Sequence, residues 1–378
     1  MRQSKRGQVD PFIVMDVMEA ARRAEAAGRR IIHMEIGQPA TGAPETARAA
    51  LRDRLDEPLG YTVALGLPAL RAGIADLYRR WYGLDLDPER VVVTAGSSGG
   101  FMLAFAALFD AGDRVAIGEP GYPSYRQIMR AMSLQPVGIQ TAPEHRYQPR
   151  PEEIPGDVQG LMLASPGNPS GTMLGPDDYR GLLDRARGLG ISVISDEIYH
   201  GLSYGGRCHS ALEISDDVYV INSFSKYFSM TGWRIGWMVV PPDHVRTIER
   251  LAQNMFICPS HASQVAALAA LEATEECEAR LAVYAENRQM LLQALPGLGF
   301  DRIAPPDGAF YLYADVSSLT DDSSRFAAEI LEGAGVAATP GLDFDPRRGK
   351  TTLRFSYARG SEEIAEAITR LTRFMETR

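Results

Sequence analysis

The sequence predicts an α/β protein with a large domain built on a mostly parallel sheet and a second, smaller α+β domain. Two observations carry this prediction. Short apolar runs in the middle of the chain alternate with helical patterns, which is typical of a parallel sheet covered by helices on both faces. The chain also has 378 residues, which is long for one hydrophobic core and favours two domains.

Five short apolar runs predict the strands of the large sheet. Most are followed by a polar or Gly/Pro-rich turn, and helical patterns such as DDYRGLLDRARGLG lie between several of them. Continuous apolar runs of this length are typical of strands buried on both faces. The predicted strands are RVVVTA (90–95), DRVAIGE (113–119), GLMLAS (160–165), ISVIS (191–195) and VYVINS (218–223).

The two ends of the chain predict the remaining elements. A helix over 12–27 should end at Gly28, and a helix over PALRAGIADLYRRWYG should end at Gly83. A strand is expected in RRIIHMEIG. A long helical stretch over 264–299, broken near its middle, leads into strands in GAFYLYADV, GVAATPG and TTLRFSYA and a closing helix over 361–375. The predicted units are an N-terminal segment (1–45) that packs with the small domain, a large domain (46–275) and a C-terminal small domain (276–378).

Composition and charge exclude several classes of protein. The formal net charge is −9, whereas a general nucleic-acid-binding protein would carry a basic face. The three cysteines form no CxxC pair and the six histidines form no HExxH pattern, so neither a disulfide framework nor a metal site is expected. We find no signal-peptide core and no apolar run of about 20 residues, so we expect a cytoplasmic protein that does not span a membrane.

Polar residues follow three of the predicted strands. Asn168, Asp196 and Lys226 come after runs that begin about 30 residues apart, which is the length of one βαβ unit. In an open α/β sheet, ligands bind beyond the carboxyl ends of the strands. We therefore expect these three side chains at one edge of one sheet.

A phosphate-binding turn is predicted where VVVTAGSSGG joins a strand to a helix. Backbone N–H groups, including that of Gly99, and the hydroxyls of Ser97 or Ser98 would face an anion at the helix N-terminus. The stretch is neither a Walker A loop nor GxGxxG, and a Gly/Ser turn that only caps a helix is the commoner case. Ser223 and Arg234 strengthen the phosphate interpretation because they follow another strand of the same sheet and an arginine fork can bind a phosphate dianion.

Lys226 lies in NSFSKYFSMTGWRIGW, between serines and aromatic residues. Lysines usually stay at the surface. Beside a phosphate site, however, a lysine suggests pyridoxal 5′-phosphate, whose aldehyde forms a covalent Schiff base with a lysine amine. Desolvation would lower the pKa of Lys226 and free its amine. A carboxylate must also keep the pyridine nitrogen protonated, and Asp196 is placed for this role.

With these features, the chain resembles a class I/II aminotransferase of the aspartate aminotransferase superfamily, fold type I. The resemblance runs from about residue 30 to the C-terminus and rests on six motifs in the family's order: VTAGSSGG, EPGYPSY, SPGNPSGT, SDEIYHGL, NSFSKYFSMTGWRIGW and LRFSYA. It implies a large domain with a mostly parallel, seven-stranded sheet flanked by helices. It also implies an enzyme that moves an amino group from an L-amino acid to a 2-oxo acid in two half-reactions.

The resemblance also implies a role for each matching residue. Lys226 would form the Schiff base and move the proton, and Asp196 would pair with the pyridine nitrogen. Arg354 would receive the substrate α-carboxylate beside Gly37. Tyr199 and Asn168 would bind the phenolic oxygen of the cofactor, and Asn168 would also lie near the substrate carboxylate. Tyr122 would stack on the cofactor ring. The residues that would hold the phosphate are Ser97, Ser98, Gly99, Ser223, Ser225 and Arg234.

A further match implies a homodimer. Tyr61 in GYTVALGLPALR corresponds to a tyrosine that reaches the phosphate in the neighbouring subunit. The active site would then be complete only in a homodimer.

Other functions remain open at this level. A carbon–sulfur β-lyase of the same fold would use the same lysine, aspartate and cofactor. A serine acyl-enzyme is a remote alternative, because Ser223 and Lys226 form an S-x-x-K pattern. A cofactor-binding transcription regulator is disfavoured, because the resemblance starts too near the N-terminus to leave room for a DNA-binding domain.

The sequence gives little information about the side chain of the substrate. Arg354 indicates an amino acid, and no additional cation for an acidic side chain can be placed. Tyr125, Tyr311 and Phe256 lie near the motifs and hint at a neutral or apolar substrate; packing of a dimer interface is the alternative role for the same residues. The identity of the amino acid and of the 2-oxo acid stays open.

Overall fold

A computed structural model describes all residues from 1 to 378. The helices are α1 (Ile13–Ala26), α2 (Glu45–Arg52), α3 (Pro68–Tyr82), α4 (Gly96–Leu108), α5 (Pro123–Ala131), α6 (Pro176–Leu189), α7 (Val245–Met255), α8 (His261–Ala270), α9 (Thr274–Ala294), α10 (Ser323–Ala334) and α11 (Ser361–Glu376). The strands are β1 (Ile32–His33), β2 (Val91–Thr94), β3 (Arg114–Glu119), β4 (Gln135–Gln140), β5 (Gly160–Ala164), β6 (Ser192–Asp196), β7 (Tyr219–Ser223), β8 (Gly236–Val239), β9 (Arg302–Ile303), β10 (Tyr311–Asp315), β11 (Val336–Ala337), β12 (Thr339–Pro340) and β13 (Thr352–Ser356).

The large sheet has seven strands in the order β2-β8-β7-β6-β5-β3-β4. All neighbouring pairs are parallel except those of β8, which runs antiparallel to both β2 and β7. The mostly parallel seven-stranded sheet is therefore confirmed. All five strands predicted from apolar runs are present as β2, β3, β5, β6 and β7.

Two strands of this sheet, β4 and β8, were not predicted from the sequence. β4 is the edge strand QPVGIQ, and most of its residues are only half-buried, so it shows no continuous apolar run. β8, GWMV, follows β7 after a segment that contains only a short 3-10 helix (Thr231–Trp233), and it returns antiparallel, with no α-helix between the two strands to mark it as a separate unit. Both departures arise from strands that lack the βαβ pattern on which the prediction relied.

The large sheet separates two hydrophobic clusters. Val91, Val93 and Trp237 belong to the larger cluster, whereas Val92 and Met238, their neighbours along the same strands, belong to the smaller one. Successive side chains of a strand point to opposite faces, so both faces of the sheet are covered. This explains why these strands read as unbroken apolar runs.

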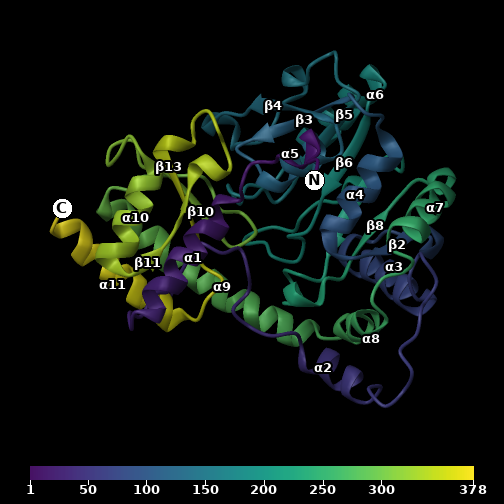
Figure 1. The fold of residues 1–378 in the computed structure, drawn as a ribbon, viewed down its shortest axis with the longest axis horizontal. Helices are drawn as coiled ribbons and strands as arrows, with labels where there is room; N and C mark the ends of the chain where they lie inside the picture. The colour runs from purple at the N-terminus through teal and green to yellow at the C-terminus, as the bar shows by residue number, and fades with distance from the viewer.

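The smaller α+β part is built from both ends of the chain. Its antiparallel sheet has the order β12-β13-β10-β9, and the N-terminal β1 pairs in parallel with the C-terminal β11. The predicted long helical stretch is broken between α8 and α9, and Figure 1 shows α9 running from α8 toward the C-terminal elements. None of the helices is long and apolar enough to cross a membrane.

The topology brings the predicted polar residues to one edge. Ala164, the last residue of β5, pairs with Asp196, the last residue of β6, and Asp196 pairs with Ile221 of β7. Asn168 and Lys226 follow shortly after the ends of β5 and β7. Because these strands are parallel, their carboxyl ends open at the same side of the sheet.

Candidate active site

A cavity of about 540 Å³ lies at this edge, between the large sheet and the C-terminal sheet. Most of the predicted site residues line it. They are Gly37, Ser97, Ser98, Tyr122, Asn168, Asp196, Tyr199, Ser225, Lys226, Arg234 and Arg354.

Lys226 stands in the cavity wall, just after β7. Its Nζ donates to the carbonyl oxygen of Gly37 at 2.5 Å and lies 5.6 Å from the centre of the Tyr199 ring. Burial lowers the pKa of Lys226 to about 7, and the positive charge of Arg354 adds to this effect. A large fraction of the amine is therefore unprotonated near neutral pH, which a nucleophile or base requires.

Asp196 is buried at the end of β6, where two donors hold its carboxylate. The hydroxyl of Tyr125 donates to Oδ2, and the backbone N–H of Ile198 donates to Oδ1 at 3.1 Å. Burial raises the pKa of Asp196 to about 6, while the hydrogen bond from Tyr125 opposes this rise. The carboxylate is therefore a strong acceptor in a poorly hydrated place, suited to pairing with a cationic ring nitrogen.

Arg354 on β13 is only 3% exposed and forms no salt bridge with any carboxylate of the chain. Its Nη1 donates to Oδ1 of Asn168 at 2.9 Å, and its Nη2 donates to the carbonyl oxygen of Glu35. Its buried Nε has no hydrogen-bond partner. Burying an unpaired cation is costly, so the site fits an anionic ligand such as a carboxylate.

The turn at the N-terminus of α4 contributes Ser97 and Ser98 to the cavity, facing Arg234. Arg234 is exposed, has a left-handed backbone (φ +50°) and donates from Nη1 to the carbonyl oxygen of Thr231 at 2.9 Å. Gly96 also has a positive φ of +68°, and a Cβ there would lie 2.4 Å from Nη2 of Arg234. The glycine thus permits the guanidinium to approach the helix N-terminus, where both favour an anion.

Three predicted site residues lie outside the cavity wall. Gly99 is buried in the first turn of α4. Ser223 donates to the carbonyl oxygen of Ile235 at 3.0 Å and bonds the Ser225 hydroxyl at 2.8 Å. This buried, engaged hydroxyl does not favour the serine acyl-enzyme interpretation. Tyr61 is 83% exposed and borders a different groove together with Cys258.

Sequence reasoning missed an apolar wall of the cavity. Phe12, Val14 and Met15 line it from the N-terminal segment, and Phe12 packs edge-on against Tyr122 with 5.9 Å between ring centres. The carboxylate of Asp343 anchors this segment by accepting from the backbone N–H groups of Ile13 and Val14 at 2.9 and 3.3 Å. The remaining cavity residues missed at first are Ile36, Gln38, Ile198 and Thr231.

The aromatic residues expected near the substrate divide into two groups. Tyr125 and Tyr311 do line the cavity. The expectation for Phe256 is wrong, because this side chain does not line the cavity and packs against the smaller core cluster instead. His200 also faces away, bonding Tyr82 at 2.5 Å and the carbonyl oxygen of Ser165 at 2.9 Å.

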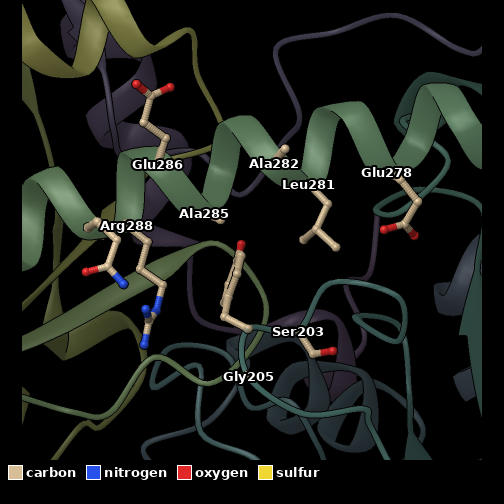
Figure 2. Close-up of a pocket in the computed structure, with 10 residues that line it drawn as sticks. Ser203, Gly205, Glu278, Leu281, Ala282, Ala285, Glu286 and Arg288 are labelled. Carbon is tan, nitrogen blue, oxygen red and sulfur yellow. The ribbon is translucent and has the colours of Figure 1, made fainter.

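A second cavity, of about 630 Å³, lies along α9 and contains none of the predicted site residues. Figure 2 shows one wall formed by α9, from Glu278 to Arg288, opposite the segment that carries Ser203 and Gly205. It lacks the lysine, the carboxylate beside it and the anion-binding turn that the first cavity combines. Size therefore does not identify the site; the arrangement of charged groups does.

Comparison with known proteins identifies the family of the chain. Residues 29–371 match the family model of aminotransferase class I and II. The valine–pyruvate aminotransferase of Mycobacterium tuberculosis is 46% identical over 98% of this chain and 97% of its own length. A crystal structure of an aminotransferase from the same organism is 45% identical, with a TM-score of 0.98 over the whole of both chains.

More distant relatives keep the same fold. The structure of the aspartate aminotransferase of Thermus thermophilus with maleate is 31% identical and superimposes with a TM-score of 0.92, covering 99% of this chain and all of that one. The chain therefore belongs to the class I and II aminotransferases, the pyridoxal-phosphate-dependent enzymes that transfer an amino group between an amino acid and a 2-oxo acid.

Proposed function

We propose that this aminotransferase takes the amino group of a neutral, apolar L-amino acid and uses Lys226 as the residue that bonds the cofactor. The observation that carries the proposal is the placement of Lys226, with a pKa lowered to about 7, in one cavity with the buried carboxylate of Asp196 and the guanidinium of Arg354, whose Nε has no hydrogen-bond partner. These are the amine, the ring-nitrogen partner and the carboxylate receptor that the reaction needs.

The residues present fit pyridoxal 5′-phosphate. The phosphate would be held at the N-terminus of α4 by Ser97 and Ser98, with Ser225 and Arg234 from the segment after β7. The roles at the ring are divided among other elements: Asp196 at the pyridine nitrogen, Tyr199 and Asn168 at the phenolic oxygen, and Tyr122 against the ring face. Neighbouring strands of one sheet supply these groups: Tyr122 follows β3, Asn168 follows β5, and Asp196 and Tyr199 come from the end of β6 and the turn after it.

When bound, the cofactor supplies an aldehyde that condenses with amines and a protonated ring that draws electrons from the substrate α-carbon. Arg354 would orient the substrate by binding its carboxylate with two nitrogen donors. Lys226 would take the proton from the substrate α-carbon at its Nζ and hold it for return during the amino-group transfer. Asp196 would keep the ring nitrogen protonated while charge develops.

The charges of the cavity support a neutral substrate side chain. Its cationic residues are Lys226, Arg234 and Arg354, and each has a role in the scheme above. None is left for a second carboxylate, and the wall formed by Phe12, Val14 and Met15 is apolar. A similar enzyme from Mycobacterium tuberculosis is a valine–pyruvate aminotransferase, which supports a branched apolar donor and a small 2-oxo acid acceptor for this chain.

The proposal is tested by following the visible absorbance of the holoenzyme after adding single L-amino acids without a 2-oxo acid. We expect L-valine and similar apolar amino acids to change the absorbance and to release at most one equivalent of 2-oxo acid per site. L-Aspartate should be at least about tenfold less efficient, because its second carboxylate would enter an apolar wall. Continuous release of 2-oxo acid would instead establish a lyase, and a preference for L-aspartate would refute the neutral side-chain pocket.

We also propose a homodimer in which Tyr61 completes the neighbouring active site. Tyr61 is exposed, and so are three apolar side chains: Leu55 is 61% exposed, Val63 56% and Ile257 53%. Such exposed apolar residues favour a protein interface.

Hybrid dimers of Tyr61→Ala and Lys226→Ala subunits test the proposed shared site. Because one hybrid site carries both lesions and the other neither, subunit exchange should raise activity above that of either variant homodimer, up to about half the wild-type activity per hybrid. No recovery after subunit exchange would refute the shared site.

The division into segments at 1–45, 46–275 and 276–378 remains part of this proposal. Pairing of β1 with β11 supports joining the N-terminal segment to the C-terminal part. A cytoplasmic location is proposed on the three unpaired cysteines.

A further inference from the structure

Tyr311 is a buried residue of the cavity to which the scheme above gives no role. It lies on β10 and is 1% exposed. Its hydroxyl lies 2.8 Å from that of Tyr199, and the guanidinium carbon of Arg354 lies 4.4 Å from the centre of its ring. Tyr311 therefore touches both the residue expected at the cofactor oxygen and the residue expected at the substrate carboxylate.

The backbone of Gly37 lies close against the Tyr311 hydroxyl. A Cβ on Gly37 would lie 2.0 Å from the Tyr311 hydroxyl oxygen, so only glycine allows the two to approach. The carbonyl oxygen of the same Gly37 accepts from Nζ of Lys226. A tyrosine hydroxyl held this firmly, against a position that tolerates no side chain, is suited to a directional hydrogen bond.

The direction of that hydrogen bond follows from counting protons. Each tyrosine has one hydroxyl proton to donate and can also accept. If Tyr199 gives its proton to the cofactor oxygen, only Tyr311 can donate within the pair. A donor to Tyr199 polarises its O–H bond and strengthens the next hydrogen bond in the chain.

Arg354 acts on the same chain through the face of the Tyr311 ring. Burial raises the pKa of Tyr311, and the charge of Arg354 opposes this rise, which means that the cation makes the hydroxyl a better donor. A substrate carboxylate bound to Arg354 would offset that charge. Donation from Tyr311, and with it donation from Tyr199, would then weaken.

We propose that Tyr311 is a positioning residue that transmits the charge state of the Arg354 site to Tyr199, so that carboxylate binding adjusts the hydrogen bond which Tyr199 gives to the cofactor oxygen. The inference rests on the proposed function. Its chemical consequence is specific: a weaker donor leaves more negative charge on the cofactor oxygen, which holds the proton of the adjacent Lys226 linkage more tightly. Substrate binding would thus make that linkage more basic.

A double-mutant cycle tests the relay, with the pKa of the Lys226 linkage measured by visible absorbance of the holoenzyme between about pH 5 and 10. Tyr199→Phe should raise this pKa by about one unit, the size of one hydrogen bond to a charged group. Tyr311→Phe should raise it by about 0.3 unit, since a neighbouring bond contributes a fraction of that effect. The double variant should equal Tyr199→Phe, because Tyr311 acts only through Tyr199. Additive shifts, or none in Tyr311→Phe, would overturn the proposal.

Tyr313→Phe is the matched control. Tyr313 lies on the same strand, is 2% exposed and loses a comparable buried hydrogen bond, to Thr352 at 2.7 Å, but it does not line the cavity. We expect no change in the linkage pKa in this variant. Equal shifts in Tyr313→Phe and Tyr311→Phe would mean a general packing effect and would count against the relay.

The Arg354 part of the relay has its own measurement. Saturating 3-methylbutanoate, a carboxylate without an amine, should raise the linkage pKa of the wild type, and the rise should be smaller in Tyr311→Phe. It should not vanish, because Arg354 also bonds Asn168. An undiminished rise in Tyr311→Phe would refute transmission through Tyr311. A wild type with no titrating visible band would contradict the proposed function itself, so the two failures are distinguishable.

Discussion

Replacement of Lys226 by alanine is expected to reduce turnover by about 10⁴-fold or more while leaving the fold intact. The variant loses the amine that bonds the cofactor and also the group that moves the α-proton, and a positioned base alone contributes about 10² to 10⁴. Its effect on stability should be small or favourable, because burial and Arg354 both disfavour the charged form of this lysine.

Two measurements separate this role from a structural one. Thermal unfolding of the apoprotein should be unchanged or slightly raised in Lys226→Ala. Ethylamine in the buffer should restore part of the single-turnover rate, and the restored rate should rise with pH as the added amine loses its proton. Lys226→Arg should stay inactive, because a guanidinium remains charged at all working pH values. Turnover near the wild-type rate in either variant would disprove the assignment.

The parallel core of the fold could be predicted from sequence because its physical cause is local. Strands buried on both faces are rich in apolar residues, and the runs of this kind that alternate with helical patterns are β2, β3, β5, β6 and β7. The edge strand β4 is mostly half-buried and shows no such run, whereas β8 is apolar and buried on both faces but follows β7 with no α-helix between them, so it does not stand out as a separate unit. The same topology explains why Asn168, Asp196 and Lys226 could be grouped in advance, since the ends of parallel strands meet at one edge.

The rest of the cavity depends on contacts between distant parts of the chain. Val14 and Met15 reach it because Asp343, 330 positions from Ile13, anchors the start of α1. No periodic pattern in the sequence records such a contact. Tyr311 belongs to a strand that reads as ordinary core, and only the structure shows its hydroxyl against Tyr199. Phe256 was misassigned for the same reason, because closeness to a motif in sequence did not bring it into the cavity.

The second large effect is expected at Arg354, where activity should fall steeply while stability changes little. Arg354→Gln should lower kcat/KM by about 10³-fold, because a buried, two-pronged hydrogen bond to a carboxylate is worth about 4 kcal/mol. The stability of the apoprotein should change little, because removing a buried cation that has no carboxylate partner offsets the loss of its hydrogen bonds to Asn168, to the carbonyl oxygen of Glu35 and to Thr339.

Arg126 provides the contrasting control, because it is similarly buried but is paired with a carboxylate of the chain. It lies 3.5 Å from the carboxylate of Glu119 and donates to the carbonyl oxygens of Asp343 and Phe344 at 3.0 and 3.2 Å. Arg126→Gln should therefore lower the free energy of unfolding by about 3 kcal/mol, since it leaves a buried acid and two carbonyls without their partner. Calorimetric unfolding of both apoproteins, together with kcat/KM for L-valine, decides the matter. If Arg354→Gln unfolds as easily as Arg126→Gln, Arg354 is a structural residue; if it unfolds like the wild type but no longer binds substrate, its buried charge is held ready for the substrate carboxylate.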